Sequence, residues 1–504
     1  MLRGHKDNLI SKFNGLWDQG DPDNTPLDHF SDCENIQYVG VNSFKTRFGI
    51  DPFQGVAGPI GNIVRIYNYI TASKNTLIVL TYDGTTGKIY HVVDSTTIFG
   101  PILTITGMSD FGFVPYAGRA YITPFGTSVI GGLNIEKGLA GEFLYVYLGA
   151  GAAARKAAGA TPAGTVVVAN GAAGHTDGGQ KVFAVIGESD SGFLSAPFAF
   201  AAFVTSSTLS VSFSSVPLMV GTQWTKRHIV STISITGYNG DLQGYQFFFI
   251  PNATINDNTT ATLSNISFYD ADLLDDASHL LDNLSSIPAG VGLCMYHQRL
   301  VLFTTATDIS LLYISEPGEP EAINAISGLL IVSLDGNPIT DADEMRDILY
   351  VTKRNRTVAF VDNGDVPSSW NEQIIDLALG TPVHGIATVI DSGSTSTDFL
   401  LMATYRGIYL FNGRFNDPEL SFKIRGLWLR QIRNNFRKIQ LLNDPIDKII
   451  YCILPDGRLL IGDYNNGRDY KNIRWAPWKF DINVNTVALV NINTLVIGSE
   501  GAFS

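Results

Sequence analysis

The sequence contains few charged residues and few cysteines. Asp, Glu, Lys and Arg make up 16% of its 504 residues, and the net charge is −13. Because proteins that bind free nucleic acid normally present a basic face, this balance argues against dedicated DNA or RNA binding. The three cysteines, Cys33, Cys294 and Cys452, are odd in number and widely spaced. They indicate neither a disulfide framework nor a zinc site, and we expect them to be buried as small apolar residues.

Long stretches with helical periodicity are nearly absent. The apolar runs are rich in Thr, Ser, Val, Ile and Phe, and the chain has 50 glycines, a combination that favours an all-β protein. The first residues, MLRGHKDNLISKF, lack the apolar segment of a signal peptide. Phe193–Trp224 is long and uncharged, but prolines interrupt it and part of it alternates as a strand does. We therefore expect no membrane association.

Catalytic signatures are also missing. The sequence contains no G-x-S-x-G, no H-E-x-x-H and no P-loop, and its eight histidines are scattered. The Gly-rich loop 55–61 lacks the lysine and the following helix of a phosphate site. We expect no catalytic residues, no metal and no cofactor.

Carboxylates alone are numerous enough for an active site. They cluster at Asp270, Asp272, Asp275 and Asp276, and again at Asp335, Asp341, Asp343 and Glu344. A glycosidase needs two carboxylates across a cleft, and a calcium loop needs oxygen ligands at alternating positions. Neither cluster matches these patterns recognisably, so we interpret both as solvated turns or helix N-termini.

A hairpin pattern recurs along the chain. Its clearest copy, DKIIYCILPDGRLLIGDYNN, predicts strands over Ile449–Leu454 and Leu459–Tyr464 with a turn at Pro455–Gly457. Copies begin near residues 76, 119, 299, 348, 399, 449 and 494. Five of the six steps are about 43 to 51 residues, which matches the period of a propeller blade. The remaining step is longer by about 130 residues, the size of an inserted domain.

These observations predict an all-β fold, a β-propeller of about six or seven blades interrupted by a β-sandwich insertion of the immunoglobulin or fibronectin type. A β-sandwich array or a β-solenoid could give a similar pattern. We expect an N-terminal arm (1–60), the first part of the propeller (61–148), an Ala/Gly-rich linker (149–179), the sandwich (180–287) and the second part of the propeller (288–504).

Smaller expectations attach to this division. The arm would wrap the first blades or reach a neighbour. Short helices could form at Ala152–Ala158 and within Tyr269–Asn283. The final half-copy, Asn493–Ser504, could close the propeller by pairing with a strand from the N-terminal region, or could pair with another chain.

One segment, Phe422–Gln440, is basic within an acidic protein. It could be a contact patch for an acidic partner surface or a phosphate backbone, or an outward-facing strand with ordinary solvated charges. The candidate partner-binding residues are Lys423, Arg425, Trp428, Arg430, Arg433, Phe436, Arg437 and Lys438.

Several segments carry a resemblance to a known family. They are DCENIQYVGVNSFKTRFGIDPF (32–53), TKRHIVSTI (225–233), AGVGLCMYHQRLVLF (289–303), ISEPGEPEAIN (314–324) and ITDADEMRDILYVTKRNRTVAFV (339–361). In these strings the chain resembles the tail hub or nozzle proteins of short-tailed bacteriophages, also called packaged-DNA stabilisation proteins. Arg47 and Gly49 stand where that pattern has them. Phe48 replaces its usual Pro, and the second string lacks its Tyr.

The resemblance implies a structural virion protein of the tail. Identical subunits, a hexamer in that family, would form a ring below the portal and adaptor. The ring would retain and conduct DNA without binding it specifically, and no catalytic residues would be needed. An acidic wall suits this role because repulsion keeps a passing strand from sticking.

Two other function classes stay open. A carbohydrate-binding or glycoside-hydrolysing β-propeller would need carboxylates and aromatic residues that converge at one face. A cell-surface adhesion module is the third alternative, and the apparent absence of a signal peptide counts against it.

Overall fold

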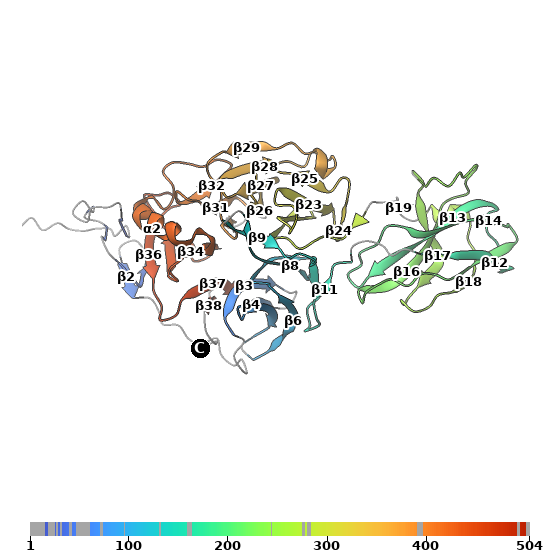
Figure 1. The fold of residues 1–504 in the computed structure, drawn as a ribbon, viewed down its shortest axis with the longest axis horizontal. Helices are drawn as coiled ribbons and strands as arrows, with labels where there is room; N and C mark the ends of the chain where they lie inside the picture. Colours follow the sequence, from blue (N-terminus) through green and yellow to red (C-terminus); the bar gives the residue numbers. More distant parts are fainter. Residues whose placement is uncertain are drawn as a thin grey trace, which may run out of the picture.

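The computed structural model describes most of the chain. The described residues are 16–18, 26, 29–30, 33–39, 43–46, 61–70, 74–94, 96–130, 133–158, 164–242, 244–274, 278–279, 284–390, 397–490 and 494–499. The fold is all-β, with 53% strand and 5% helix. It has two parts, a ring of small sheets (residues 63–156 and 284–499) and an inserted domain (167–279) that projects to one side (Figure 1).

The described parts of the ring contain seven antiparallel sheets, one after another along the chain. The first sheet contains β3 (Ile63–Ile70), β4 (Asn75–Tyr82), β5 (Thr86–Val92) and β6 (Ile98–Thr106), and the second contains β7 (Asp110–Tyr116), β8 (Arg119–Ile130), β9 (Leu133–Gly138), β10 (Tyr145–Tyr147) and β11 (Arg155–Lys156). The third contains β20 (Leu284–Ser285), β21 (Gly292–Tyr296), β22 (Arg299–Phe303), β23 (Leu311–Glu316), β24 (Glu319–Asn324) and β25 (Leu329–Ile331), and the fourth contains β26 (Ile339–Met345), β27 (Ile348–Lys353), β28 (Arg356–Phe360) and β29 (Gln373–Asp376). The fifth contains β30 (Ile386–Val389), β31 (Phe399–Ala403) and β32 (Ile408–Phe411), the sixth contains β33 (Gln440–Asp444), β34 (Ile449–Ile453), β35 (Leu459–Asp463) and β36 (Arg474–Trp478), and the seventh contains β37 (Val484–Val490) and β38 (Thr494–Ser499).

The sheets close into a ring through one inner strand each. The inner strands β3, β7, β21, β26, β30, β33 and β37 contact one another in this order, and β37 contacts β3. Apolar side chains fill the spaces between neighbouring sheets. Val487 of β37 packs with Tyr451 of the sixth sheet, and Ala488 packs with Ile63 of the first. The last sheet therefore lies between the sixth sheet and the first and completes the cycle.

The recurring hairpin corresponds to one position in every sheet. Its copies begin at β4, β8, β22, β27, β31, β34 and β38, the strand that follows the inner strand. The predicted hairpin at 449–464 is confirmed to within one residue at the end of each strand, as β34 and β35. Gly457 in its turn has φ +83°, a conformation that favours glycine. The final half-copy forms β38, which pairs with β37. Among the described residues β38 pairs with no strand of the N-terminal region, one of the two alternatives that we considered.

The inserted domain consists of two sheets around one core. One sheet contains β12 (Val167–Ala173), β15 (Leu209–Ser214) and β18 (Leu263–Ile266). The other contains β14 (Phe198–Thr205), β13 (Gly179–Ser189), β16 (Trp224–Ser231), β17 (Phe247–Ile255) and β19 (Ser278–His279). Phe213 and Phe183, one from each sheet, meet edge to face with ring centroids 5.3 Å apart. Because the core draws apolar residues from both sheets, the two faces are packed together.

The Ala/Gly-rich segment 149–179 contributes strands to both parts of the molecule. Arg155–Lys156 form β11, which pairs with β10 of the ring, so the helix expected at Ala152–Ala158 is wrong. Val167–Ala173 form β12, which pairs with β15 of the inserted domain. The short helix expected within Tyr269–Asn283 is α1 (Asp270–Leu273), a single turn, and residues 275–277 and 280–283 lie outside the described residues.

Described pieces of the N-terminal arm lie on the sixth sheet, and not on the first blades as expected. The arm contains a hairpin of β1 (Ile36–Val39) and β2 (Ser43–Thr46). The Tyr38 hydroxyl donates to the carbonyl of Trp475 at 3.1 Å, and the Trp478 indole donates to the carbonyl of Ile36 at 2.7 Å. Arg47 and Gly49, which carry part of the family resemblance, lie outside the described residues.

Helices are short. Besides α1, the structure has α2 (Arg425–Asn435) and the single 3₁₀ turns η2 (Pro367–Ser369), η3 (Phe422–Ile424) and η4 (Phe436–Lys438). Among the described residues, none of these helices has the length and hydrophobicity to cross a membrane.

Candidate functional site

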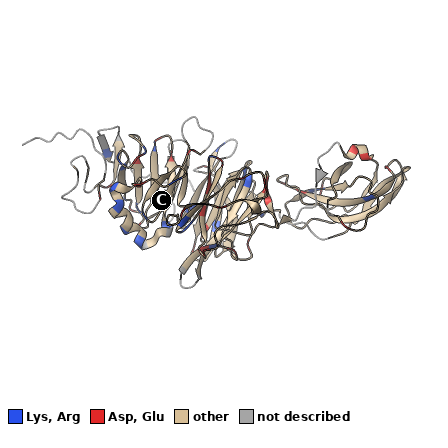
Figure 2. Ribbon diagram, turned by 90° about the horizontal axis from the view of Figure 1, so that it is seen from above, with Lys and Arg blue, Asp and Glu red and all other residues tan. Residues whose placement is uncertain are grey.

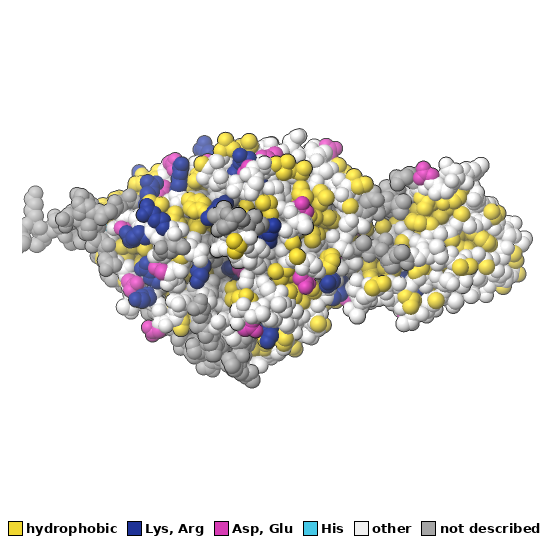
Figure 3. Space-filling view, viewed as in Figure 1, with side chains coloured by type: hydrophobic (Ala, Val, Ile, Leu, Met, Phe, Trp, Pro, Cys, Tyr) yellow, Lys and Arg dark blue, Asp and Glu magenta, His cyan; other side chains and the backbone are white. Residues whose placement is uncertain are grey.

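The basic segment Phe422–Gln440 is helical. The strand that we considered there is wrong, because the segment forms η3, α2 and η4. Its buried apolar residues recur at helical spacing, at Ile424, Leu427, Trp428, Ile432 and Phe436. Figure 2 shows arginine positions at intervals along the α2 ribbon, and Figure 3 shows Lys and Arg side chains on the surface over this part of the ring. Arg430 and Arg433 of α2 are exposed.

Three of the eight candidate partner-binding residues are buried and cannot touch a partner. Trp428 is 0% exposed, and its indole donates to the carbonyl of Thr404 at 3.0 Å. Phe436 stacks on Tyr405 with centroids 3.9 Å apart. The Lys423 ammonium donates to the carbonyls of Lys471 and Ile473. For these residues the expectation is corrected, since they anchor the helix to the ring.

The other candidates divide between paired and exposed side chains. Arg425 makes a bidentate contact with the buried Glu419, at 2.7 and 2.5 Å. Arg430 binds Asp18 of the N-terminal arm at 2.6 Å. Arg433 and Lys438 are exposed, and the Arg437 side chain lies outside the described residues. The surface that remains for a partner is Arg430, Arg433 and Lys438, which we call the α2 basic face.

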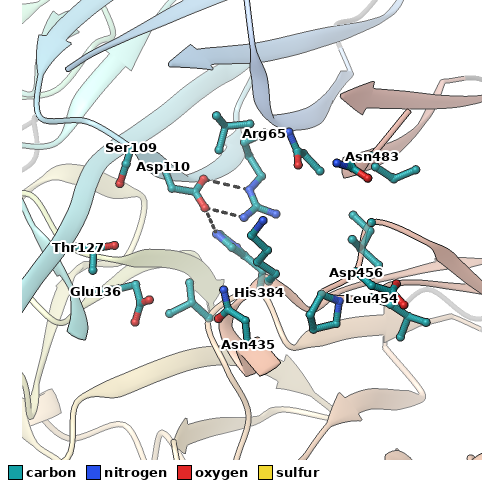
Figure 4. A pocket seen from close by; sticks show the side chains of 18 of the residues that line it. Arg65, Ser109, Asp110, Thr127, Glu136, His384, Asn435, Leu454, Asp456 and Asn483 are labelled. Atoms are coloured by element: carbon teal, nitrogen blue, oxygen red, sulfur yellow. Dashed lines mark hydrogen bonds and ion pairs between the residues drawn. The ribbon is translucent and has the colours of Figure 1, made fainter. Parts of the chain in front are cut away.

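A polar cavity of about 490 Å³ opens where the inner strands begin (Figure 4). Its walls come from the starts of β3, β7 and β37, from the loop before β30, and from the β34–β35 turn. The end of α2 contributes Asn435, and η4 contributes Lys438. The candidate basic segment and the centre of the ring therefore meet at this cavity, which the sequence alone did not indicate.

Arg65, Asp110 and His384 form the ionic centre of the cavity (Figure 4). The Asp110 carboxylate accepts from Arg65 Nε at 3.0 Å and Nη2 at 2.5 Å, and His384 Nε2 lies 3.4 Å from its Oδ2. Burial alone would raise the pKa of Asp110, but the attraction of Arg65 and His384 holds it below its ordinary value. Burial and Arg65 lower the pKa of His384. The centre is a buried ion pair with a neutral imidazole beside it.

Asp341 and Asp343 occupy the interior of the ring on β26. Asp341 Oδ2 accepts from the backbone N–H of Ile386 at 3.0 Å, and Asp343 Oδ1 accepts from that of Glu344 at 2.8 Å. Burial raises the pKa of Asp341 well above its ordinary value and that of Asp343 to about 7. The interpretation as solvated turns or helix N-termini is wrong for these two residues, because both lie on a strand and are desolvated.

The other clustered acids serve the fold. Asp335 forms an ion pair with the buried Lys353 at 2.7 Å. Asp270, at the start of α1, pairs with the buried Lys181, and Asp272 accepts from the backbone N–H of Tyr269 at 2.7 Å. Asp275 and Asp276 lie outside the described residues.

Side-chain partners also occupy the carboxylate of Asp456, in the cavity wall. It binds Gln431 at 2.6 Å and Arg458 at 2.8 Å. Asp110 is likewise held ionised by Arg65. A glycosidase needs one carboxylic acid kept protonated beside a second carboxylate. In this cavity Asp110 and Asp456 each have partners within the chain instead.

The inserted domain is attached to the ring by a buried ionic cluster. Glu321 of β24 is 1% exposed and accepts from Arg155 Nη1 of β11 at 2.9 Å. Arg155 Nε also binds Asp190, and the Ser191 hydroxyl donates to Glu321. Asp190 and Ser191 lie in the segment between β13 and β14 of the inserted domain. Ala322 of the ring packs into that domain's core, so the attachment is both ionic and apolar.

The cysteines behave largely as expected. All three are free; Cys294 and Cys452 are buried, and Cys33 is partly buried. Burial raises the pKa of the Cys294 and Cys452 thiols, which makes them poor nucleophiles and metal ligands.

No protein-family model matches the chain, and no curated protein matches it. Among solved structures, the chain is similar to apo AztD from Citrobacter koseri at 9% identity and a TM-score of 0.30, over 89% of this chain and 91% of that one. It is also similar to Hsv2 from Kluyveromyces lactis at 10% identity and a TM-score of 0.29, over 88% of this chain and 100% of the other. Similarity at this level carries no function to this chain, so the proposals below rest on its own residues.

Proposed function

We propose that this protein is a structural component of a phage tail, a hub or nozzle subunit that assembles into a ring with copies of itself. The sequence resemblance supports this assignment. We further propose that each of the seven sheets is one blade of a β-propeller and that the inserted domain is a β-sandwich of the immunoglobulin or fibronectin type. The propeller would be the body of the subunit, and the sandwich would be its projecting arm, a different part of the chain from the N-terminal arm of residues 1–60.

The attachment of the inserted domain is the observation that carries the proposal. Interfaces between domains of one chain are often polar and allow relative motion. Here Glu321, which is 1% exposed, binds Arg155, and Arg119 donates to the carbonyl of Ser191. Together with the apolar contact of Ala322, these residues fix the inserted domain to the ring of sheets. A fixed arm can hold a neighbouring subunit at a set angle, which a closed ring of identical copies requires.

The surface of the arm suits contact with protein. Charged side chains are sparse on the face seen in Figure 3, and apolar side chains gather there. Val220 is 80% exposed, Val204 66% and Leu274 61%. Large exposed apolar side chains are characteristic of interaction surfaces. The inserted domain therefore offers apolar surface for subunit contacts.

Any DNA channel would belong to the assembly and not to one subunit. Side chains occupy the centre of the ring of sheets within one subunit. There the Tyr67 hydroxyl lies 3.1 Å from His384 Nδ1, and Asp110 binds Arg65. A DNA duplex cannot pass such a centre. Copies arranged around a common axis could enclose DNA instead, and a net charge of −13 per chain would disfavour its sticking to the wall.

The test is the mass and shape of the full-length protein, by light scattering with negative-stain imaging, alone and with a portal–adaptor complex of a short-tailed phage. We expect a closed ring with a central hole, a hexamer if the resemblance holds. The variant R430A/R433A/K438A tests whether the α2 basic face takes part in contact with the complex. A monomer that ignores the complex and binds glycans would refute the proposal.

The polar cavity supports one alternative, a carbohydrate-binding or glycoside-hydrolysing propeller. Asn435, Asn483 and Asn485 line it together with Thr127 and Ser109, and such side chains hydrogen-bond sugar hydroxyls readily. A glycan array would decide this alternative. Glycan binding that is lost in N435A/N483A would favour it, and an empty array would remove it.

A further inference from the structure

Two hairpin turns lie side by side where inner strands of the ring end. The β21–β22 turn consists of His297 and Gln298, with φ +46° and +62°, and the β26–β27 turn consists of Arg346 and Asp347, with φ +54° and +60°. Such two-residue turns are tight and hold their side chains in defined directions. Since β21 and β26 are neighbours in the ring, the turns bring His297 Nε2 to 3.6 Å from Asp347 Oδ1.

Glu344 of β26 completes a group of three ligand-bearing side chains. One ligand atom each from His297, Glu344 and Asp347 lies within 4.8 Å of the other two. The group draws one ligand from the third sheet and two from the fourth. It is separate from the polar cavity, which opens where the inner strands begin.

The buried side chain of Tyr296 packs against the group. Tyr296 is 0% exposed, and its ring stacks on the His297 imidazole with centroids 4.3 Å apart and planes at 18°. The Tyr296 hydroxyl donates to the carbonyl of Asp347 at 3.1 Å and accepts from the N–H of Asp362 at 2.8 Å. This single side chain ties together the two turns and the end of β28.

Asp362 lies on the far side of the imidazole. Its Oδ2 is 3.7 Å from His297 Nδ1 and 3.7 Å from Arg299 Nε. At these distances Asp362 makes no hydrogen bond to the ring, but its carboxylate places negative charge beside Nδ1. Nε2 lies 3.6 Å from Asp347 Oδ1, and we take it as the ligating atom.

We propose that His297, Glu344 and Asp347 form a binding site for a divalent transition metal, with Zn²⁺ the best match. One imidazole and two carboxylates would supply three ligands, which zinc binds at about 2.0–2.2 Å. Water or a fourth group would complete the tetrahedron. Calcium takes six to eight oxygen ligands, so a site with a nitrogen donor and only two carboxylates selects against it. The Asp347 side chain is 85% exposed, so it can move toward the ion without disturbing packing.

A bound ion would cross-link the third and fourth sheets of the ring at their inner edges. An ion that binds the folded chain and not the unfolded one raises stability with its concentration. We therefore expect the site to be structural and to stabilise the contact between the two sheets, and not to be a catalytic centre.

Isothermal titration of the metal-free, full-length protein with ZnCl₂ tests the proposal, with Co²⁺ absorption as the spectroscopic readout. We expect one saturable equivalent and at least tenfold weaker binding in H297A and in E344Q/D347N. The control H175A, which removes an exposed histidine outside the group, should bind as the wild type does. Circular dichroism and the melting temperature without metal confirm that each variant is folded.

Three outcomes would overturn the proposal. One is the absence of saturable Zn²⁺ binding. Another is H297A binding with wild-type affinity. The third is Ca²⁺ competing as well as Zn²⁺, which would indicate adventitious carboxylates. A zinc-dependent rise in melting temperature in the wild type and H175A, absent from H297A, would support it independently of the titration.

Discussion

Arg155 and Glu321 face each other across the junction between the two parts of the molecule. The guanidinium donates to both carboxylate oxygens, Nη1 to Oε2 at 2.9 Å and Nη2 to Oε1 at 3.1 Å. Asp190 binds the remaining edge of Arg155 through Nε at 2.9 Å. Since Arg155 contacts the ring and the inserted domain at once, it helps to set the orientation of the inserted domain.

Removing the charge of Glu321 should loosen the arm. E321Q removes one of the two carboxylates that bind Arg155, which keeps Asp190, and weakening such a buried contact costs about 1–3 kcal/mol. We expect a lower free energy of unfolding in urea and faster proteolysis between residues 156 and 167. K74A removes a partner of the exposed Asp94 at 3.8 Å and should leave stability nearly unchanged, because exposed ion pairs contribute little. Equal effects in the two variants would contradict a specific role for the junction.

Replacing Asp343 should stabilise the ring at neutral pH. Burial among Asp341, Glu344 and Cys294 raises its pKa to about 7, so the folded state binds a proton that the unfolded state has released. Wild-type stability should therefore fall as pH rises from about 4 to 7. D343N removes this cost, up to about 4 kcal/mol above pH 7 and little at pH 4. Urea denaturation at pH 4.5 and pH 8 measures the difference, and a variant that is less stable at pH 8 would refute the assignment.

Asp110 should show the opposite dependence. Arg65 and His384 lower its pKa, so its contribution is complete above the unfolded value near 4 and is lost as pH falls through the folded one. D110N leaves Arg65 buried without a charged partner, which costs about 3–5 kcal/mol at pH 7. Denaturation curves for wild type and variant should converge as pH falls toward 3. Curves that stay equally far apart would show that the ion pair is not responsible.

The buried and exposed faces of α2 should respond differently to mutation. W428A removes a fully buried indole and its hydrogen bond to Thr404, and such truncations cost about 3–5 kcal/mol. R433A changes an exposed side chain and should alter stability by about 0.5 kcal/mol or less. Thermal denaturation of both variants separates anchoring from surface charge. A large loss in R433A would mean that this arginine has a structural partner.

The sequence predicts the second strand of each sheet well and the inner strand poorly. Second strands such as β34 are buried along their whole length, which requires unbroken apolar runs that repeat visibly. Inner strands such as β3 and β26 include Arg65, Asp341 and Asp343 because they line the polar centre. This interrupts the alternation by which a strand is recognised.

The candidate site was harder to predict, for reasons of spacing and distance. Trp428 lies four residues before Ile432 and eight before Phe436, a helical signal that the cluster of arginines obscured. Arg65, Asp110 and His384 are far apart in sequence, and only closure of the ring brings them together. No local motif could reveal that group, whereas the hairpin that begins near residue 299 was recognisable without its neighbour.

The contact between β37 and β3 also bears on how the chain is made. During synthesis the inserted domain has all of its described strands once residue 279 has left the ribosome, so it can form its own core early. The ring can close only later. Its closing contact joins β3 to β37, and β37 and β38 are synthesised more than 400 residues after β3. Until then the apolar faces of the first and sixth sheets stay open to water, and nascent chains in this interval are the ones most in need of a chaperone.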